Sequence, residues 1–219
     1  EQTERHGVYI VGYTDGTFGP SRSMTRAEAA AIFARLLAEK NGDTISTAAN
    51  TKFADIPAHA WYSGYVKYLS NNGITYGKSK TIFAPNDAIT RAEFTTMAVR
   101  FFDVYGDGDA EIMEQFSGFN DVSSGYWAAK YIKYAALHGW INGYGDGSFH
   151  AEREINRAEV VTIVNRLLGR EADEDYIADN LRKLNTFPDV SRKHWAYYAV
   201  MEAANAHTAV LGESESWSK

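Results

Sequence analysis

The sequence predicts a mainly α-helical protein built from three helix–turn–helix repeats. Two separate motifs recur along the 219 residues, three times each and with nearly the same period. Both motifs carry apolar residues at helical spacing, and turn-rich links join them. Two independent motifs that share one period are hard to explain by chance, so the repeat is the organising unit of the chain.

The first motif is an Arg-Ala-Glu helix. It reads MTRAEAAAIFARLL from Met24, ITRAEFTTMAVRFF from Ile89 and INRAEVVTIVNRLL from Ile155. Apolar residues follow each of its arginines at +6, +7, +10 and +11, apart from alanine at one of these positions. This one-sided stripe is typical of a helix with one buried face.

The second motif is a helix that begins near a tryptophan. It reads FADIPAHAWYSGYVKYL, FNDVSSGYWAAKYIKYA and FPDVSRKHWAYYAVMEA. After each tryptophan, the positions +4, +5 and +8 are apolar or aromatic, which predicts a second helix with a buried face. The three tryptophans are Trp61, Trp127 and Trp195.

Turn-rich links lie between the motifs, and longer polar segments lie between the copies. Links 12–18 and 143–149 contain Asp-Gly, a strong tight-turn signal, whereas link 77–83 does not, so we expect a different turn there. Of the polar segments 39–52, 103–118 and 170–186, the last is expected to be partly helical. Acidic residues at 103–111 loosely resemble a calcium loop, but their spacing does not fit an EF-hand and favours a solvated loop.

The start of each Arg-Ala-Glu helix has the pattern of a capping box. Here a Thr or Asn side chain caps a free backbone amide, and a Glu three residues on reaches back. The caps are Thr25, Thr90 and Asn156, and the glutamates are Glu28, Glu93 and Glu159. On this structural interpretation, the arginines Arg26, Arg91 and Arg157 face solvent in the first turn.

A functional interpretation adds an anion to the cap. A helix N-terminus carries partial positive charge, so an arginine there is unfavourable, yet three copies keep one. A carboxylate ligand would relieve that repulsion, and arginine can hold it with two parallel hydrogen bonds. The residues alone leave both interpretations open. The arginines that recur at +9 are interpreted as helix-dipole partners; they are Arg35, Arg100 and Arg166.

Two interpretations also stay open for the aromatic residues. Burial in the core is the default for the three motif tryptophans, and contact with a sugar in a groove is the alternative. Trp140 has no counterpart and is expected to line one groove only. Aspartates six residues before each motif tryptophan are expected to cap that helix or brace the turn; they are Asp55, Asp121 and Asp189.

Composition and motif content exclude several functions. The chain has no cysteine, which removes disulfides, thiolate metal sites and cysteine nucleophiles. A net charge of −6 argues against non-specific binding to nucleic acid, and no apolar run is long enough to span a bilayer or form a signal peptide. The six histidines show no metal-ligand spacing, and no nucleophile elbow, Walker loop or dinucleotide fingerprint is present. We therefore expect no catalytic residues, no metal and no cofactor.

The motifs resemble the S-layer homology family, whose repeat runs from an F-x-D-V…W helix through a G-Y-x-D-G-x-F turn to a T-R-A-E helix. The resemblance covers most of the chain outside the polar segments. It implies three repeats about a pseudo-threefold axis, with a three-helix central bundle and outer helices and loops. It also implies a monomeric pseudo-trimer, although the oligomeric state stays open.

The resemblance implies a function as well. Family members hold secreted proteins on the wall of bacteria, mostly Gram-positive, by binding a secondary cell-wall polysaccharide that is often pyruvylated. The expected partner is therefore this anionic polysaccharide, without nucleic acid or membrane insertion, at an extracellular location in the cell wall or S-layer. The implied binding residues come from the repeats; they are Arg26, Glu28, Arg91, Glu93, Arg157, Glu159, Trp61, Trp127 and Trp195.

The order of the halves departs from the family pattern. The chain begins with a turn and an Arg-Ala-Glu helix and ends with an unmatched F-x-D-V…W half. We expect one domain, 1–219, in which the C-terminal half-repeat (187–206) completes copy 1 (about 7–38). Copies 2 and 3 are expected at about 53–102 and 119–169.

Two other functions stay open: a protein–protein module for assembly of the S-layer lattice, and a hydrolase of the wall polymer. A hydrolase would be expected to use a unique carboxylate pair rather than a threefold echo. The three grooves are expected to be unequal, with the groove that uses link 77–83 the weakest, because its turn differs.

Overall fold

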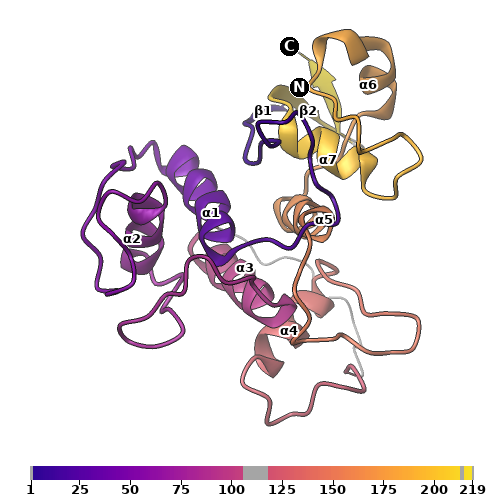
Figure 1. The fold of residues 1–219 in the computed structure, drawn as a ribbon. Helices are drawn as coiled ribbons and strands as arrows, with labels where there is room; N and C mark the ends of the chain where they lie inside the picture. The colour runs from indigo at the N-terminus through magenta and orange to yellow at the C-terminus, as the bar shows by residue number, and fades with distance from the viewer. Residues whose placement is uncertain (1, 106–117, 213–214, 219) are drawn as a thin grey trace. The chain divides into compact units, whose positions relative to one another are not determined.

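The computed structural model describes residues 2–105, 118–212 and 215–218, and this part of the chain is mainly α-helical, as predicted. Figure 1 shows its helices and its one small sheet. The helices are α1 (Arg26–Asn41), α2 (Ser63–Asn71), α3 (Arg91–Tyr105), α4 (Ala129–Leu137), α5 (Arg157–Leu168), α6 (Glu174–Asn180), the 3₁₀ helix η1 (Leu181–Lys183) and α7 (Tyr197–Ala204). The strands are β1 (Gln2–His6), β2 (His207–Leu211) and β3 (Ser216–Ser218).

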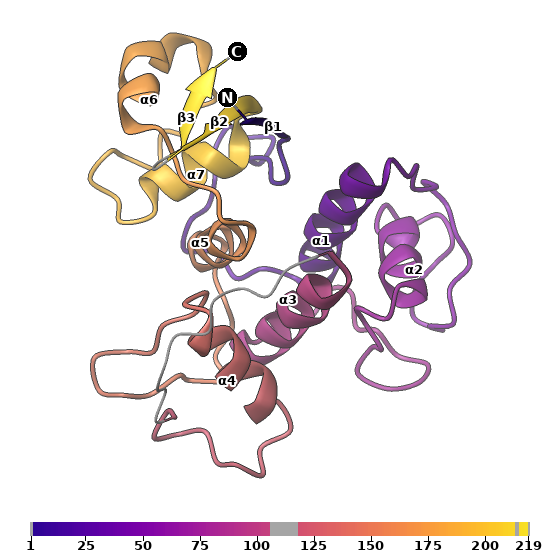
Figure 2. The same cartoon turned by 180° about the vertical axis from the view of Figure 1, so that it is seen from behind.

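The chain divides into two compact units. One unit comprises residues 23–155 and contains α1 to α4. The other combines residues 1–22 with 156–219 and therefore joins the two ends of the chain, as both views show (Figures 1 and 2). None of the helices in the described residues is long and apolar enough to cross a membrane.

The Arg-Ala-Glu helices begin where the capping pattern places them. In α1, Thr25 accepts a hydrogen bond from the Glu28 amide and the Glu28 carboxylate accepts one from the Thr25 amide. The same reciprocal box is present before α5, at Asn156 and Glu159, and before α3, at Thr90 and Glu93. Helices α1 and α5 end at Gly42 and Gly169, both in the left-handed conformation. Glycine suits this conformation because it has no Cβ to be strained by it.

Each F-x-D-V segment is locked to a turn by the same three contacts. The aspartate accepts hydrogen bonds from two turn amides, the first phenylalanine packs on the turn phenylalanine, and its ring also covers the first glycine of the turn. Asp121 accepts from the Phe149 and His150 amides at 2.7 Å each, and the rings of Phe119 and Phe149 lie 5.1 Å apart. A Cβ on Gly143 would collide with the Phe119 ring, which explains the glycine.

The other two turns repeat this arrangement. Asp55 accepts from the Phe83 and Ala84 amides, and Asp189 accepts from the Phe18 and Gly19 amides. The expectation that these aspartates cap a helix or brace the turn resolves in favour of the turn. The C-terminal F-x-D-V segment therefore braces the N-terminal turn across the ends of the sequence.

The turn at 77–83 differs from the other two at its tip, as expected: the Ser79 amide donates to the Ile82 carbonyl at 3.1 Å, whereas the Gly16 and Gly147 amides donate to the Tyr13 and Tyr144 carbonyls. It closes with a hydrogen bond from the Lys78 amide to the Ile82 carbonyl at 2.8 Å. The turns of copies 1 and 3 close with the equivalent bonds, Tyr13 to Thr17 and Tyr144 to Ser148. All three turns have the same length and the same closing bond, because the Asp-Gly sequence is only one way to make the chain reversal.

The outer helices pack in order against the Arg-Ala-Glu helices. Helix α2 packs on α1, α4 packs on α3 and α7 packs on α5, while α1 also contacts α3. Phe33 of α1 lies 5.3 Å from Phe94 and 4.9 Å from Phe101 of α3, measured between ring centroids, and all three side chains are fully buried. The α7 helix thus packs beside the third Arg-Ala-Glu helix, while the loop before it braces the first turn.

The small sheet was not predicted. β1, β2 and β3 pair in that order, antiparallel, with His6 opposite His207 and Ala209 opposite Trp217. The expectation of helix in segment 170–186 is confirmed by α6 and η1. The residues of the loose calcium-loop pattern, apart from Asp103, lie outside the described residues.

Candidate functional site

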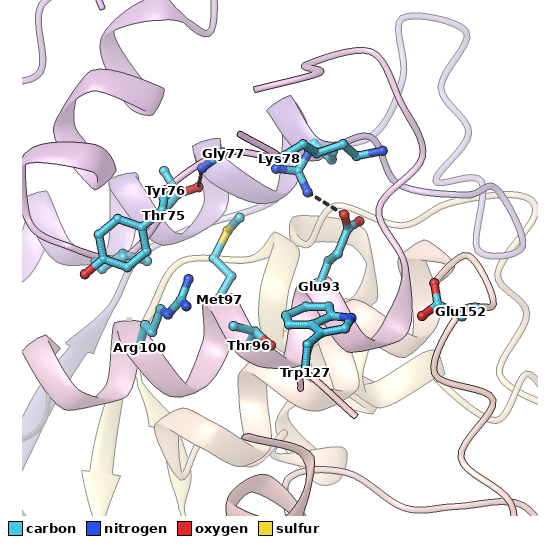
Figure 3. Close-up of a pocket in the computed structure, with 12 residues that line it drawn as sticks. Thr75, Tyr76, Gly77, Lys78, Glu93, Thr96, Met97, Arg100, Trp127 and Glu152 are labelled. Atoms are coloured by element: carbon cyan, nitrogen blue, oxygen red, sulfur yellow. Dashed lines mark hydrogen bonds and ion pairs between the residues drawn. The ribbon is translucent and has the colours of Figure 1, made fainter. Parts of the chain in front are cut away.

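The unit of residues 23–155 contains a pocket of about 440 Å³ that gathers cationic, aromatic and acidic side chains (Figure 3). One wall is α3, a second is the turn that follows Ile74, and Trp127 and Glu152 complete the lining. The lining residues are Arg26, Ile74, Thr75, Tyr76, Gly77, Lys78, Glu93, Thr96, Met97, Arg100, Trp127 and Glu152. Three of the sequence-predicted site residues, Arg26, Glu93 and Trp127, therefore meet in one place.

Arg26 is a buried residue with two structural partners. Its side chain is 5% exposed, its Nε donates to the Phe83 carbonyl at 2.7 Å, and its Nη1 lies 3.0 Å from Glu93 Oε1. Its guanidinium also lies over the Phe83 ring, 5.0 Å from the centroid. The guanidinium therefore ties α1 to both the next turn and the next Arg-Ala-Glu helix.

The other two motif arginines make the same contact, in which Nε donates to a carbonyl in the turn of another copy; this contact is the arginine lock, or lock for short. Nε of Arg91 donates to the Phe149 carbonyl at 2.9 Å, and Nε of Arg157 donates to the Phe18 carbonyl at 2.8 Å. Both side chains are buried. The interpretation of these arginines as solvent-facing residues is wrong, because each packs into the turn of another copy instead of extending into water.

The helix N-termini also differ from the expectation of free amides. The amides of Arg26 and Ala27 donate to the carbonyls of Asp87 and Pro85, at 2.9 Å each, and the next amide donates to Thr25. Corresponding bonds begin α3 and α5. An anion at this site would therefore be held by side chains and not by first-turn amides.

The motif tryptophans lie on the surface. Trp61 and Trp127 are each 54% exposed, and Trp195 is 64% exposed. The default interpretation, a core anchor, is wrong for all three. Trp140, in contrast, is buried: it is 3% exposed, and its ring lies 4.6 Å from the Phe102 ring, measured between centroids. It therefore has no exposed face that could line a groove.

Two further cations border the pocket. Arg100 lies over the Tyr76 ring at 4.7 Å, and its Nη2 lies 3.2 Å from the Tyr131 hydroxyl. Burial raises the pKa of Tyr131, but the Arg100 hydrogen bond and charge outweigh burial and lower it below its usual value. Lys78 pairs with Asp87 at 2.8 Å. The +9 arginine of copy 2 is thus a pocket residue and not only a helix-dipole partner.

Thr96 supplies a buried polar group without a protein partner. Its side chain is 3% exposed, it lines the pocket, and its hydroxyl has no hydrogen-bond partner within the described residues. Leaving a buried hydroxyl unpaired is unfavourable, so a ligand that pairs with it would gain affinity. Sequence reasoning missed Thr96 and Tyr76; the recurrence of arginine at +9 was the only available signal for Arg100.

The chemistry of the pocket suits a polar ring that carries a negative charge. An exposed indole and a tyrosine ring offer flat apolar faces, the guanidinium groups offer charge-assisted donors, and Glu93 and Glu152 offer acceptors for hydroxyl groups. Most of the charged donors in the pocket already bind protein groups through hydrogen bonds or ion pairs, as Arg26 does. The pocket is therefore held in shape before a ligand binds.

The sequence is similar to those of known proteins. The model of the S-layer homology domain matches residues 4–30, 52–95 and 118–161. The chain is similar to cell surface glycoprotein 1 of Acetivibrio thermocellus, at 34% identity over 96% of this chain and 9% of that protein. It is also similar to the cellulosome-anchoring protein of the same organism, at 31% identity over 97% of this chain and 45% of that protein. The surface-layer 125 kDa protein of Lysinibacillus sphaericus is 32% identical over 73% of this chain and 13% of that protein.

The matched segments follow the structural repeat and end inside its Arg-Ala-Glu helices, at residues 30, 95 and 161. Each covers an Arg-Ala-Glu block, and two of them also cover an F-x-D-V block and the turn that it braces. The chain spans less than half the length of each of these three relatives. Three matched segments together cover more than half of the residues, and the chain belongs to the S-layer homology domain family.

Proposed function

We propose that this chain is a non-catalytic module that holds a secreted or S-layer protein at the bacterial surface by binding an anionic cell-wall polysaccharide. The observation that carries the proposal is the pocket lined by Arg26, Arg100 and Trp127, whose wall also includes Thr96, with a buried hydroxyl that is unpaired within the described residues. Its exposed indole, its cations and its polar interior match a charged sugar better than a peptide or a nucleic acid.

The names of the relatives support the anchoring role. One similar protein is a cellulosome-anchoring protein and two others are surface proteins of bacteria. Two similar enzymes, an exoglucanase and an amylopullulanase, share only 14% and 8% of their length with this chain. We infer an extracellular location in the wall or S-layer of a Gram-positive bacterium, with any catalysis located outside this module.

A pyruvyl ketal on the sugar is the ligand group that fits best. It places a carboxylate beside an apolar methyl and a pyranose ring. The carboxylate would bind at the guanidinium groups of Arg26 and Arg100, and the sugar face would stack on Trp127. A sugar hydroxyl would bond to Thr96, which removes the unpaired buried group.

We further propose that residues 1–219 act as one domain with three related grooves about a pseudo-threefold axis. The support is the repeated lock: each motif arginine donates to the turn of another copy, and each turn is braced by an F-x-D-V segment. In this proposal, copies 2 and 3 are 53–102 and 119–169, and 187–206 completes copy 1. The grooves would use the remaining predicted residues; these are Glu28, Arg91, Arg157, Glu159, Trp61 and Trp195.

A threonine pair on α3 tests the pocket with a matched control. Thr95 and Thr96 are adjacent, both are buried, and neither hydroxyl has a protein partner in the described residues, but only Thr96 lines the pocket. Thr→Val replaces each hydroxyl with a methyl group of similar volume. We expect T96V to weaken binding of a pyruvylated wall disaccharide roughly 2- to 10-fold, the value of one hydrogen bond, and T95V to leave it unchanged.

Calorimetry would give the affinity, and sedimentation with protein-depleted cell walls would give the physiological readout. Walls stripped of polysaccharide but with intact peptidoglycan should lose binding. Equal affinities of T95V and T96V would reject this pocket as the sugar site. Retention on stripped walls would favour a protein–protein role, and release of reducing ends from the polymer would favour a hydrolase.

A further inference from the structure

Four potential metal ligands converge in the unit that joins the chain ends. They are His6 at the end of β1, Glu202 in α7, His207 at the start of β2 and Glu215 just before β3. Their ligand atoms all lie within 4.8 Å of one another. We propose that these four residues form a structural site for a divalent cation of the zinc type.

The distances within the cluster fit a tetrahedral ion. Nδ1 of His6 lies 3.1 Å from Nε2 of His207, 3.3 Å from Glu202 Oε1 and 3.2 Å from Glu215 Oε1. Nε2 of His207 lies 3.3 Å from Glu202 Oε2 and 3.2 Å from Glu215 Oε1. Zinc bonds of about 2.0–2.1 Å in a tetrahedron place ligand atoms roughly 3.3 Å apart. The five separations that include a histidine therefore match a zinc coordination shell, and the two carboxylates lie within 4.8 Å of each other.

Burial gives the cluster a need for positive charge. The side chain of Glu202 is fully buried, and its two oxygens face only the imidazole nitrogens of His6 and His207 among the contacts described, at 3.3 Å each. Glu215 is 4% exposed, so two carboxylates share one dry site. Taking carboxylates out of water is strongly unfavourable unless a cation compensates them. One dication would neutralise both and leave the two imidazoles as neutral ligands.

The second layer of contacts orients the ligand atoms. His207 Nδ1 lies 2.9 Å from the Asn205 carbonyl, so it donates there and turns the Nε2 lone pair to the cluster. Glu215 Oε2 accepts from the Glu171 amide at 3.0 Å, and its Oε1 accepts from Trp217 Nε1 at 3.1 Å. Carbonyl and amide contacts of this kind fix the ligands of protein metal sites.

The ligand set favours zinc over the hard cations. Calcium and magnesium prefer shells made of oxygen, whereas two imidazoles and two carboxylates in a compact buried shell suit zinc. All four positions come from the protein, which is typical of a structural site and not of a catalytic one. The ion would fasten β1 and β2 to α7 and so hold the first residues of the chain against the last.

A proton-bound cluster is the alternative arrangement. Burial lowers the pKa of His6, but hydrogen bonds to Glu202 and Glu215 outweigh it and raise that pKa to about 9. Protonated imidazoles could then balance the carboxylates without a metal, although Arg170, which is also buried, opposes a second positive charge there. Metal binding and protonation compete for the same nitrogen atoms, so a metal titration separates the two.

The test uses the full chain after treatment with a chelator. We expect one Zn²⁺ per chain by elemental analysis after dialysis, a higher melting temperature with zinc, and reversal by chelator. Co²⁺ in place of zinc should give the intense visible absorption of a four-coordinate site. Both E215Q and H6A should weaken zinc binding at least about 10-fold, whereas H59A, which removes an exposed histidine, should not.

Several outcomes would overturn the proposal. Absence of zinc uptake by the folded wild type would leave the proton-bound arrangement as the answer, as would a Co²⁺ spectrum typical of six coordination. Unchanged affinity in a folded E215Q or H6A variant would place the ion elsewhere. If the variants do not fold, which circular dichroism reports, the stoichiometry and the Co²⁺ spectrum of the wild type decide alone.

Discussion

Replacing Arg26 with alanine should destabilise the unit of residues 23–155. The change removes the Nε donor of the Phe83 carbonyl, the ion pair with Glu93 and the packing of the guanidinium on the Phe83 ring. The capping box of α1 does not use the Arg26 side chain, so helix content should persist. The loss therefore falls on the contact between consecutive copies.

The magnitude follows from burial. A hydrogen bond to a charged group contributes about 1.5–3 kcal/mol, and Arg26 is almost fully buried, so water replaces it poorly. The ion pair adds less, because the Glu93 side chain is 19% exposed and solvent screens the pair. We expect a loss of about 2–4 kcal/mol in the free energy of unfolding.

Urea denaturation followed by far-UV circular dichroism measures this loss. The control is R35A in the same helix, since Arg35 is only half-buried and its Nε lies 3.4 Å from the Tyr65 hydroxyl. A loss for R26A within about 0.5 kcal/mol, the range of an ordinary surface change, would refute the lock. So would a loss no larger than that of R35A.

Two further predictions address the turns. Burial alone would raise the pKa of Asp121, but hydrogen bonds from the Phe149 and His150 amides outweigh it and lower that pKa. The carboxylate therefore stabilises the fold above its unfolded pKa, and this stabilisation is lost as pH falls through the lower folded pKa. D121N should flatten the acid limb of a curve of stability against pH, and an unchanged limb would contradict this. In the same turn, G143A should lower the free energy of unfolding by about 1–3 kcal/mol, because the added Cβ would collide with the Phe119 ring. G145A is the control, since a Cβ there meets no atom within 4 Å and should leave the melting temperature unchanged. Equal melting temperatures of the two variants would reject the packing argument.

The helices and their first turns could be predicted because their signals are local. A threonine followed by a glutamate three residues on defines a cap within one turn of backbone, as at Thr25 and Glu28. The apolar stripes then fix which face is buried. Repetition strengthened these predictions, since the same pattern occurs three times at one period.

The burial of the motif arginines could not be predicted from local signals. A first-turn arginine in an isolated helix extends into water, and only another copy of the repeat offers the carbonyl that buries it. Tryptophan posed the reverse problem. Its large apolar area favours burial in general, but here the smaller residues of α2 and α4 supply the core contacts, such as Val66 and Ile132.

The two clusters of functional interest depend on contacts between distant residues. The pocket joins Arg26 to Trp127, and the proposed metal site joins His6 to His207 through the register of β1 and β2. No spacing within one segment encodes either cluster. The short strand QTERH also lacks alternating apolar residues, so the sequence pattern did not predict the strand pairing that brings the histidines together.

The structure also changes how a loss of wall binding should be interpreted. Arg26 holds the fold together through Nε and Nη1 and also lines the pocket, so a folded R26A variant that loses affinity has two explanations. Removing all three motif arginines at once would weaken every lock, so a loss of binding in that variant could equally result from a loss of stability. The Thr96 hydroxyl has no hydrogen-bond partner in the part of the chain that the structure describes, so replacing it with a methyl group removes an unpaired hydroxyl and breaks no described bond. A variant that gains or keeps stability while it loses sugar affinity reports on the ligand, and we expect T96V to meet that condition in this pocket.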